Sequence, residues 1–423
     1  MVENRNGGVH MVVGRRGEKG FLTEDEIRET VEKGIPTKMI EGKRVLVLTP
    51  DGTRTAPLPM MVKILQEVIG GRAARIDFMV ALGTHRPLSE REIFQLYGIG
   101  EKEKEVRGAR SAFLNHRWDL ERCLIGMGII EARTVQEITE GLFNEDIPIE
   151  INRRVFAYDL IVILGPVFPH EVVGFSGGYK YLFPGISGGE FLHIFHWLGA
   201  INTCMETIGR KYTPTQRIIR QAAKLFRLPL YCISMVVTAE NRLAGLFVGD
   251  TEESWSKAAD LSEKLHIVHT ARPFRLVIGS ASKKYDELWT AGKVMYKLEP
   301  VVADGGTLII HGRHISTISH SWGRYLERIG YHVRDYYLSR MHAFADIPKA
   351  VLAHSTHVKG LGTYADGKET PRIHVVLATA IPERVCRKIN LGYMNPADVP
   401  IDTFRDQEIL FVEEAGEVLY RIG

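Results

Sequence analysis

The sequence has few cysteines and no long apolar run. Its four cysteines occur singly in 423 residues, with no Cys-x-x-Cys pair, at Cys123, Cys204, Cys232 and Cys386. This spacing argues against a disulfide framework and against a cysteine-based zinc site. No apolar stretch reaches about 18 residues, and the polar, glycine-rich N-terminal segment lacks the apolar core of a signal peptide. We therefore expect a cytoplasmic protein that does not enter a membrane.

An excess of one charge is also absent. The 54 Lys and Arg residues face 51 Asp and Glu residues, a formal net charge of +3, and no long basic run occurs. Composition thus gives no reason to expect nucleic acid or a membrane surface as a partner. Hydrophobic residues at 45% and charged residues at 25% are average globular usage, which excludes disorder and collagen-like repeats. The expected partner is a small molecule.

Strand-like and helix-like segments alternate along the chain. Continuous apolar runs at 44–49, 76–82 and 159–165 each end in a polar turn. Capping boxes formed by Thr23 with Glu26 and by Ser89 with Glu92 mark two helix starts. The sequence predicts an α/β protein with mainly parallel sheets, whose ligands bind beyond the carboxyl ends of the strands.

The same alternation resumes in the second half, with expected strands at 274–280, 306–312 and 373–379. A Glu- and Lys-rich helix ends before a short Pro-containing joint, where we place a domain boundary. We expect an N-terminal α/β domain over 1–268 and a C-terminal α/β domain over 269–400. Residues 401–423 are expected to form a terminal hairpin that could pack back on the first domain.

Two turns in the first half carry basic residues at strand ends. The first is Asp51-Gly52-Thr53-Arg54, and the second is Gly83-Thr84-His85-Arg86-Pro87. A capped helix start and a surface histidine would account for each turn alone. Because the planar guanidinium of arginine suits bidentate binding of carboxylates and phosphates, two such turns side by side would form an anion site.

The third turn is rich in glycine. After strand 159–165 come Pro166 to His170 and then Gly174 to Lys180. Glycines let a backbone approach a ligand closely and point amide groups at an anion, although a loop that packs closely on a neighbour is the alternative. The spacing fails the Walker pattern because Tyr179, not glycine, precedes the lysine, which argues against an ATPase.

The following helix carries three possible metal ligands. Glu190, His193 and His196 recur at i, i+3 spacing and share one helix face. The order is not His-Glu-x-x-His, so it does not match a zincin protease. Two interpretations remain open at this point, namely structural histidines and a zinc hydrolase site.

Taken together, these segments resemble the nickel-pincer nucleotide-dependent lactate racemase family. That family has Asp-x-Thr-Arg, then His-Arg-Pro, a His, Phe-Ser-Gly-Gly-x-Lys-x-x-x-Pro-Gly and a distal His. In this sequence these are Asp51 to Arg54, His85 to Pro87, His170, Phe175 to Gly185, and His196. Lys293 falls where the family has a substrate-binding lysine.

The resemblance implies a particular cofactor. It is a nickel-pincer nucleotide, a dithio-derivatised pyridinium mononucleotide that is joined through a thioamide to Lys180. Its nickel is held by two sulfurs, a ring carbon and His196 as the metal ligand from the protein. The remaining cofactor-binding residues are expected to be Asp51, Thr53, Ser176, Gly177 and Gly178, and the enzymes that synthesise the cofactor are implied partners.

The resemblance also implies an activity, that of a racemase or epimerase of a 2-hydroxy carboxylic acid. Hydride would pass from the substrate to the cofactor ring, with His85 and His170 as acid and base. Arg54 and Lys293 would bind the substrate carboxylate from the two domains, which places the active site in the interdomain cleft. The alternative is an anion- or nucleotide-binding two-domain module without racemase activity.

Three departures from the family pattern concern the substrate. Trp289 and Thr290, expected in the substrate pocket, replace the Tyr-Gln of lactate-specific members, so a different 2-hydroxy acid or a sugar acid is possible. Tyr179 replaces an arginine beside the attachment lysine. The glycine-rich turn of the second domain becomes His311-Gly312-Arg313-His314, which would add donors for a longer or more polar substrate.

Overall fold

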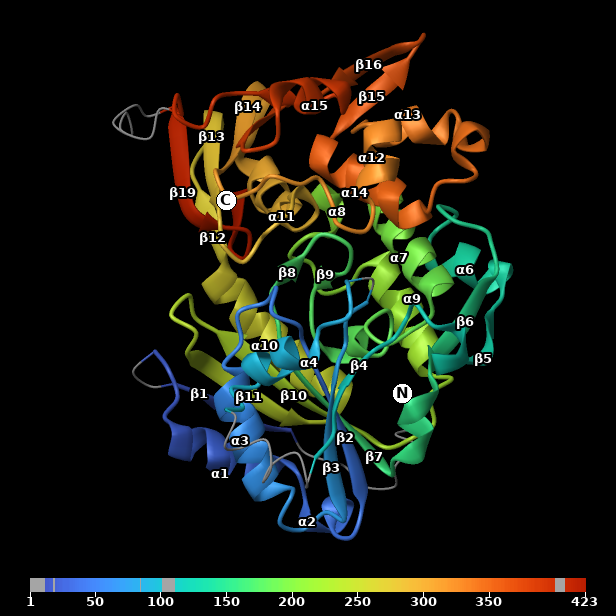
Figure 1. The fold of residues 1–423 in the computed structure, drawn as a ribbon, viewed down its shortest axis with the longest axis vertical. Helices are drawn as coiled ribbons and strands as arrows, with labels where there is room; N and C mark the ends of the chain where they lie inside the picture. The colour runs from blue at the N-terminus through green and yellow to red at the C-terminus, as the bar shows by residue number, and fades with distance from the viewer. Residues whose placement is uncertain (1–11, 18–19, 84, 101–110, 400–407) are drawn as a thin grey trace.

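The computed structural model describes residues 12–17, 20–83, 85–100, 111–399 and 408–423. A seven-stranded sheet lies in the lower part of Figure 1. Its order is β1 (Val13–Arg16), β11 (Leu243–Gly249), β10 (Leu230–Val237), β7 (Leu160–Pro166), β2 (Arg44–Thr49), β3 (Arg75–Val80) and β4 (Phe113–Asn115). A five-stranded sheet lies in the upper part, in the order β18 (Gly392–Tyr393), β17 (His374–Thr379), β14 (Val302–Gly312), β13 (Phe274–Ala281) and β19 (Ile409–Ala415).

Parallel pairing predominates in both sheets. The run from β10 through β7, β2 and β3 to β4 is parallel, and only β1, β11 and β10 pair antiparallel in this sheet. Every pairing of the five-stranded sheet is parallel. The predicted α/β class with mainly parallel sheets is therefore confirmed.

Helices cover both faces of the larger sheet because its strands are apolar on both sides. Along β2, Val45 and Val47 belong to one apolar cluster, whereas Leu46 and Leu48 belong to the other. The first cluster packs under α1 (Glu24–Gly34), α3 (Leu58–Val68) and α4 (Glu90–Leu96). The second packs under α7 (Gly189–Asn202), α9 (Pro214–Ala223) and α10 (Thr251–His266).

The second apolar cluster continues into the upper part of the molecule, so the two sheets share a connected core.

The helices of that part are α11 (Leu288–Leu298), α12 (Gly323–Ile329), α13 (Arg334–Leu338), α14 (Lys349–Lys359) and α15 (Glu383–Lys388). The remaining α-helices of the described residues are α2 (Thr37–Ile40), α6 (Ala132–Ile138) and α8 (Cys204–Thr207). Small two-stranded sheets pair β5 (Leu124–Ile130) with β6 (Ile147–Asn152), β8 (Pro169–His170) with β9 (Gly174–Phe175), and β15 (Gly362–Ala365) with β16 (Lys368–Pro371). Within the described residues, none of the helices has the length and apolar character needed to span a membrane.

Both predicted capping boxes are present. Thr23 opens α1 and Ser89 opens α4, and in each box the glutamate three residues later bonds back to the cap. The expected strands over 44–49, 76–82 and 159–165 correspond to β2, β3 and β7 with boundaries shifted by at most two residues. Local capping chemistry and apolar runs thus located these elements.

The end of the chain differs from the expected hairpin. Strand β19 pairs in parallel with β13, whereas β20 (Leu419–Ile422) pairs in parallel with β12 (Ile267–Thr270). The last two strands therefore have partners in two different sheets. Residues 401–407 of the expected hairpin lie outside the described residues. We propose that the two main sheets are the cores of the two domains, with β12 and β20 pairing across the expected boundary after residue 268.

A glycine in β9 gives a test of the local packing. Gly174 has φ of 85°, and a Cβ there would lie 1.7 Å from the carbonyl oxygen of Arg210. Gly174→Ala should therefore lower the free energy of unfolding by at least about 2 kcal/mol, measured by denaturant titration. Gly189→Ala is the matched control, because a Cβ at Gly189 meets nothing within 4 Å. An unchanged stability of Gly174→Ala would contradict this packing.

Candidate active site

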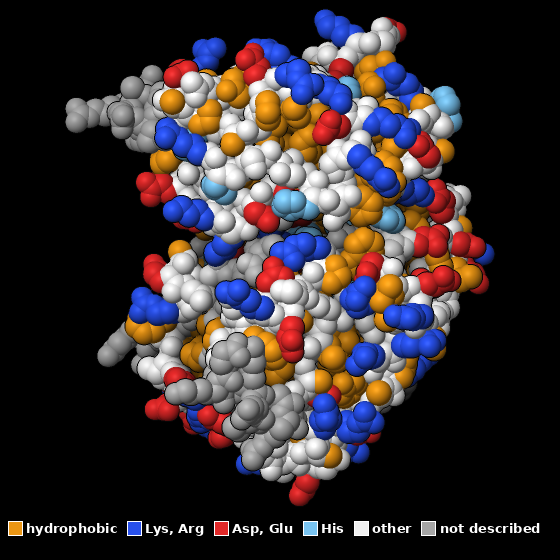
Figure 2. All heavy atoms as spheres, in the orientation of Figure 1, with side chains coloured by type: hydrophobic (Ala, Val, Ile, Leu, Met, Phe, Trp, Pro, Cys, Tyr) orange, Lys and Arg blue, Asp and Glu red, His pale blue; other side chains and the backbone are white. Residues whose placement is uncertain are grey.

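A cavity of about 160 Å³ lies between the two parts of the molecule. Figure 2 shows the outline indented between these parts, with basic and histidine side chains beside the indentation. The turns after β2, β3 and β7 line the cavity from one part, and α11 and α14 line it from the other. The predicted site residues that line it are Asp51, Thr53, Arg54, His85, His170, Ser176, Gly177, Lys180, His196, Trp289, Thr290 and Lys293.

The turn after β2 binds the histidine of the next turn. Asp51 accepts hydrogen bonds from the backbone N–H and the hydroxyl of Thr53, at 3.0 and 2.7 Å, and its second oxygen contacts Nδ1 of His85. Burial alone would raise the pKa of Asp51, but the His85 imidazole and the Thr53 bonds hold it well below its ordinary value. An ionised Asp51 can only accept, so Nδ1 of His85 carries the proton. In the neutral imidazole, the lone pair is then on Nε2.

The same turn is bound to the second part of the molecule. The Lys293 amine donates to the backbone carbonyl of Thr53 at 3.3 Å. The carboxylate of Glu417 accepts from the backbone N–H and the hydroxyl of Thr55 at 3.0 and 2.9 Å, and Lys284 also contacts that hydroxyl. Residues far apart in sequence thus fix the position of Asp51 and Arg54 against α11. Sequence reasoning missed Glu417 and Lys284, because neither stands in a recognisable motif.

His170 is buried and has its own carboxylate neighbour. Its Nδ1 accepts the backbone N–H of Val172 at 3.1 Å and lies 3.4 Å from a carboxylate oxygen of Glu171. Burial lowers the pKa of His170 well below its ordinary value, although Glu171 opposes the shift. Burial would raise the pKa of Glu171, yet His170 and Lys297 hold it well below its usual range. Each candidate acid-base histidine therefore has a carboxylate near Nδ1.

The glycines of the third turn serve packing within the loop. Gly177 and Gly178 have φ of 90° and 56°, and a Cβ on either would press on Trp255 of α10. The Trp255 indole donates to the carbonyl of Ser176 at 2.9 Å. The Ser176 hydroxyl accepts from Phe168 N–H and donates to the Pro166 carbonyl. Gly178 is not among the described residues that line the cavity, and its place in the cofactor site stays a prediction.

Two lysines line the cavity with lowered pKa values. Burial, reinforced by the guanidinium of Arg54, lowers the pKa of Lys180 from 10.5 to about 8. The same two causes lower the pKa of Lys293 to about 7, against the opposing pull of Asp51. A fraction of the Lys180 amine is therefore neutral and nucleophilic near neutral pH, as attachment of a cofactor requires.

His196 has the tautomer of a metal ligand. Its Nδ1 donates to the carbonyl of Leu192 at 2.8 Å, and burial lowers its pKa to about 3. A neutral ring whose Nδ1 carries the proton has its lone pair on Nε2, which is the arrangement found in metal-binding histidines. Among the residues that the structure describes, no three His, Cys, Asp or Glu side chains gather closely enough to hold a metal ion. The three-residue zinc site of Glu190, His193 and His196 is therefore not formed.

The second part contributes an aromatic wall that sequence reasoning only partly found. Trp289 stacks on His354 with ring centroids 4.1 Å apart, and the Thr290 hydroxyl donates to the Glu287 carbonyl at 3.1 Å. His354 and His357 line the cavity from α14 and were missed. Their i, i+3 spacing on an apolar segment was the available signal.

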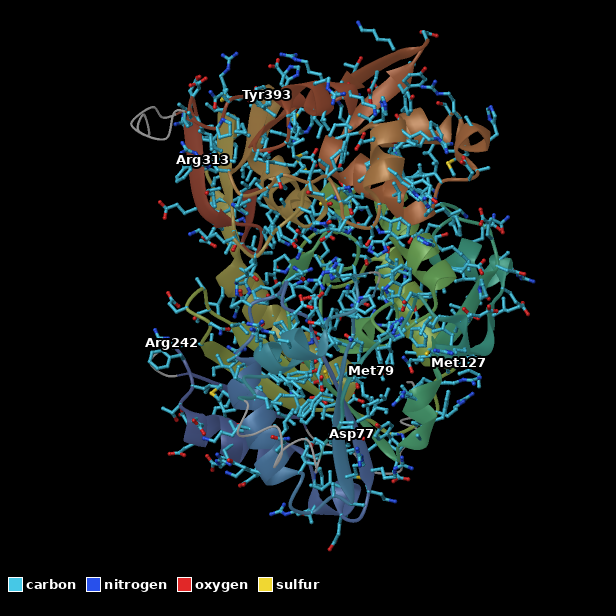
Figure 3. All side chains as sticks on the ribbon, viewed as in Figure 1. Asp77, Met79, Met127, Arg242, Arg313 and Tyr393 are labelled. Carbon is cyan, nitrogen blue, oxygen red and sulfur yellow. The ribbon has the colours of Figure 1, made fainter. Side chains whose placement is uncertain are left out.

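The second-domain turn that departs from the family pattern lies elsewhere. Figure 3 places Arg313 beside the five-stranded sheet, and its guanidinium donates to the Pro396 carbonyl at 3.4 Å. His314 contacts the carbonyl of Ser282 at 3.3 Å. No residue of 311–314 belongs to the described lining of the cavity. The expectation that this turn supplies substrate donors stays a prediction.

Comparisons with known proteins agree with the fold. A family profile, the lactate racemase N-terminal domain, matches residues 23–209. Lactate racemase of Thermoanaerobacterium thermosaccharolyticum is 25% identical over 304 residues, and that of Lactiplantibacillus plantarum is 24% identical over 296 residues. These alignments cover 68% and 67% of this chain and 65% of each relative. The chain thus matches less than two thirds of the length of either lactate racemase.

Two solved structures extend the likeness to nearly the whole chain. A crystal structure of a Thermotoga maritima protein superposes with a TM-score of 0.88 at 33% identity, covering 97% of this chain and 100% of that chain. The lactate racemase apoprotein of T. thermosaccharolyticum superposes with a TM-score of 0.73 at 20% identity, covering 94% and 92% of the two chains. The second match concerns the fold alone.

The lowered pKa of Lys180 can be measured by acylation. In the chain without cofactor, labelling of Lys180 by an acetylating reagent should rise with pH through a midpoint near pH 8. The position of the midpoint is read by peptide mass spectrometry. Arg54→Gln should shift the midpoint upward, because Arg54 is one of the charges that disfavour the protonated amine. A midpoint near 10.5 in the unsubstituted chain would contradict the described burial.

Proposed function

We propose that this chain is a member of the lactate racemase family, an isomerase that inverts C2 of a 2-hydroxy carboxylate. The proposal is supported by one cavity that brings together the site residues expected from the sequence. They are His85, His170, Lys180, His196, Arg54 and Lys293. We further propose that it works in the cytoplasm and obtains its cofactor from the enzymes that synthesise it.

Arg54 and Lys293 are proposed to bind the substrate carboxylate. They line the cavity from opposite parts, and Lys293 reaches the backbone of the turn that carries Arg54. A guanidinium offers a bidentate pair of donors, and an ammonium adds a compact charge, so together they fix one end of the substrate. Carboxylate binding between them would also draw the two parts together and exclude water from a keto acid.

His85 and His170 are proposed to exchange the hydroxyl proton. With Nδ1 of His85 directed at Asp51, Nε2 is the nitrogen that would accept the proton, and Asp51 would stabilise the resulting imidazolium. His170 lies in a different state, because its Nδ1 accepts from Val172 N–H and its proton is on Nε2. Glu171 lies close enough to stabilise a charge on His170 when that ring is protonated.

The residues present fit the nickel-pincer nucleotide implied by the sequence. Lys180 supplies an amine of lowered pKa in the cavity, and His196 supplies a neutral ring nitrogen. When bound, this cofactor supplies the acceptor and donor of hydride that carbon inversion requires. Thr53 and Ser176 bond mainly to their own loops, so we propose that they support the cofactor by holding those loops.

Loss of either histidine should lower turnover much more than it changes substrate binding. His85→Ala and His170→Ala should each lower kcat for inversion by about 10²- to 10⁴-fold, measured by chiral chromatography on protein produced with the cofactor-synthesis enzymes. KM should change less, because the carboxylate contacts remain. His374→Ala, an exposed histidine on β17, is the control and should retain full activity.

A binding module without racemase activity gives the opposite result. In that case the unsubstituted protein would bind 2-hydroxy acids or nucleotides without inverting any substrate, and both histidine variants would retain ligand affinity. Isothermal calorimetry on the same preparations separates the two outcomes.

Cofactor attachment has its own test. Intact mass analysis should find an adduct on the unsubstituted protein and none on Lys180→Arg. His196→Ala should keep the adduct but lose most of the nickel, measured by elemental analysis, because attachment and metal ligation are assigned to different residues. An adduct that persists in Lys180→Arg would reject this assignment.

A further inference from the structure

One wall of the cavity has hydrogen-bonding groups that the proposed function does not use. Ala350, His354 and His357 lie at i, i+4 and i+7 on α14 and all line the cavity. His354 and His357 are 5% and 4% exposed. The proposed function uses neither histidine to bind the substrate carboxylate, the reacting hydroxyl or the cofactor.

Both histidines have a buried ring nitrogen without a partner. These nitrogens are Nδ1 of His354 and Nε2 of His357. An unpaired buried polar atom costs about 1–3 kcal/mol, so such an atom beside a cavity is a candidate for pairing with a ligand. The backbone does not provide that partner in this structure.

The role of the His354 nitrogen follows from its other bond. Nε2 of His354 contacts the carbonyl oxygen of Trp289 at 3.1 Å, and a carbonyl can only accept. Nε2 therefore carries the proton. Burial lowers the pKa of His354 to about 3, so the ring is neutral and Nδ1 is an acceptor with a free lone pair. It needs a donor from the ligand.

Few chemical groups can supply that donor here. A second carboxylate has no proton to donate when ionised, and alkyl or aryl groups have none at all. An ammonium group is disfavoured because Lys and Arg side chains outnumber carboxylates in the lining of the cavity, three to two. The face of Trp289 toward His354 is already covered by that ring, so it is not open to an aryl substituent. A neutral hydroxyl meets the requirement.

We propose that His354 and His357 form a subsite for a hydroxyl on the substrate carbon chain beyond C2. The preferred substrates are then 2-hydroxy acids that carry at least one further hydroxyl group. His354 accepts from that hydroxyl, and the nearby nitrogen of His357 pairs with the same hydroxyl or with the next one. This inference rests on the proposed function, because it assumes that a 2-hydroxy carboxylate occupies the cavity.

The test compares substrates that differ by one hydroxyl. Nickel-loaded protein is assayed for inversion of lactate against glycerate, and of 2-hydroxybutanoate against 2,4-dihydroxybutanoate. The unsubstituted protein should favour the hydroxylated member of at least one pair by about tenfold or more in kcat/KM. His354→Phe keeps a ring against Trp289 but removes the acceptor, so the preference should fall to near one.

Three further variants keep the test decisive if His354→Phe does not fold. His354→Asn retains an acceptor oxygen near the position of Nδ1 and should keep part of the preference, whereas His357→Leu should reduce it. His374→Phe changes an exposed histidine on β17 and should leave the preference unchanged. Thermal unfolding and nickel content identify any variant that has not folded. The remaining variants then decide whether the hydroxyl subsite exists.

The outcomes separate the two proposals. Inversion of both members of each pair at equal rates, or an undiminished preference in folded His354→Phe and His357→Leu, overturns the hydroxyl subsite and leaves the racemase proposal standing. Failure of the nickel-loaded protein to invert any 2-hydroxy acid rejects the racemase proposal and the subsite with it.

Discussion

Opposite charges buried in one small cavity are the constraint on which this site depends. Arg54, Lys180 and Lys293 line the cavity together with the carboxylates Asp51 and Glu171. Burial penalises each ion separately, and nearby charges decide which stay ionised, so both carboxylates have lowered pKa values and both lysines move toward neutrality. The excess of basic groups favours an anionic ligand.

This charge balance also links the two parts of the chain. The turn after β2 holds Asp51 and Arg54, and it is bound by Lys293 and Glu417 from elements more than 200 residues away in sequence. Because the same turn contacts His85, a displacement of the two parts would move the proposed carboxylate site and the proposed acid-base pair together. In the proposed mechanism, substrate binding and proton transfer are therefore coupled.

The sequence predicted local features better than contacts between distant segments. Capping boxes, apolar runs and polar strand ends located the first-half elements and the turns that line the cavity, because each depends on neighbouring residues. The partner strands of β19 and β20 and the contact of Glu417 with Thr55 depend on tertiary pairing, which no local pattern encodes. The packing of Trp255 against the loop glycines Gly177 and Gly178 was likewise not readable from sequence.

The proposed reaction requires two histidines that flank a substrate whose carboxylate lies between Arg54 and Lys293. The most direct measurement is a crystal structure of the nickel-loaded protein with an unreactive 2-hydroxy acid analogue. We expect continuous density from the Lys180 amine to the cofactor, the analogue carboxylate against both Arg54 and Lys293, and His85 and His170 on opposite sides of C2. A free Lys180 amine, or an analogue bound away from either histidine, would contradict it.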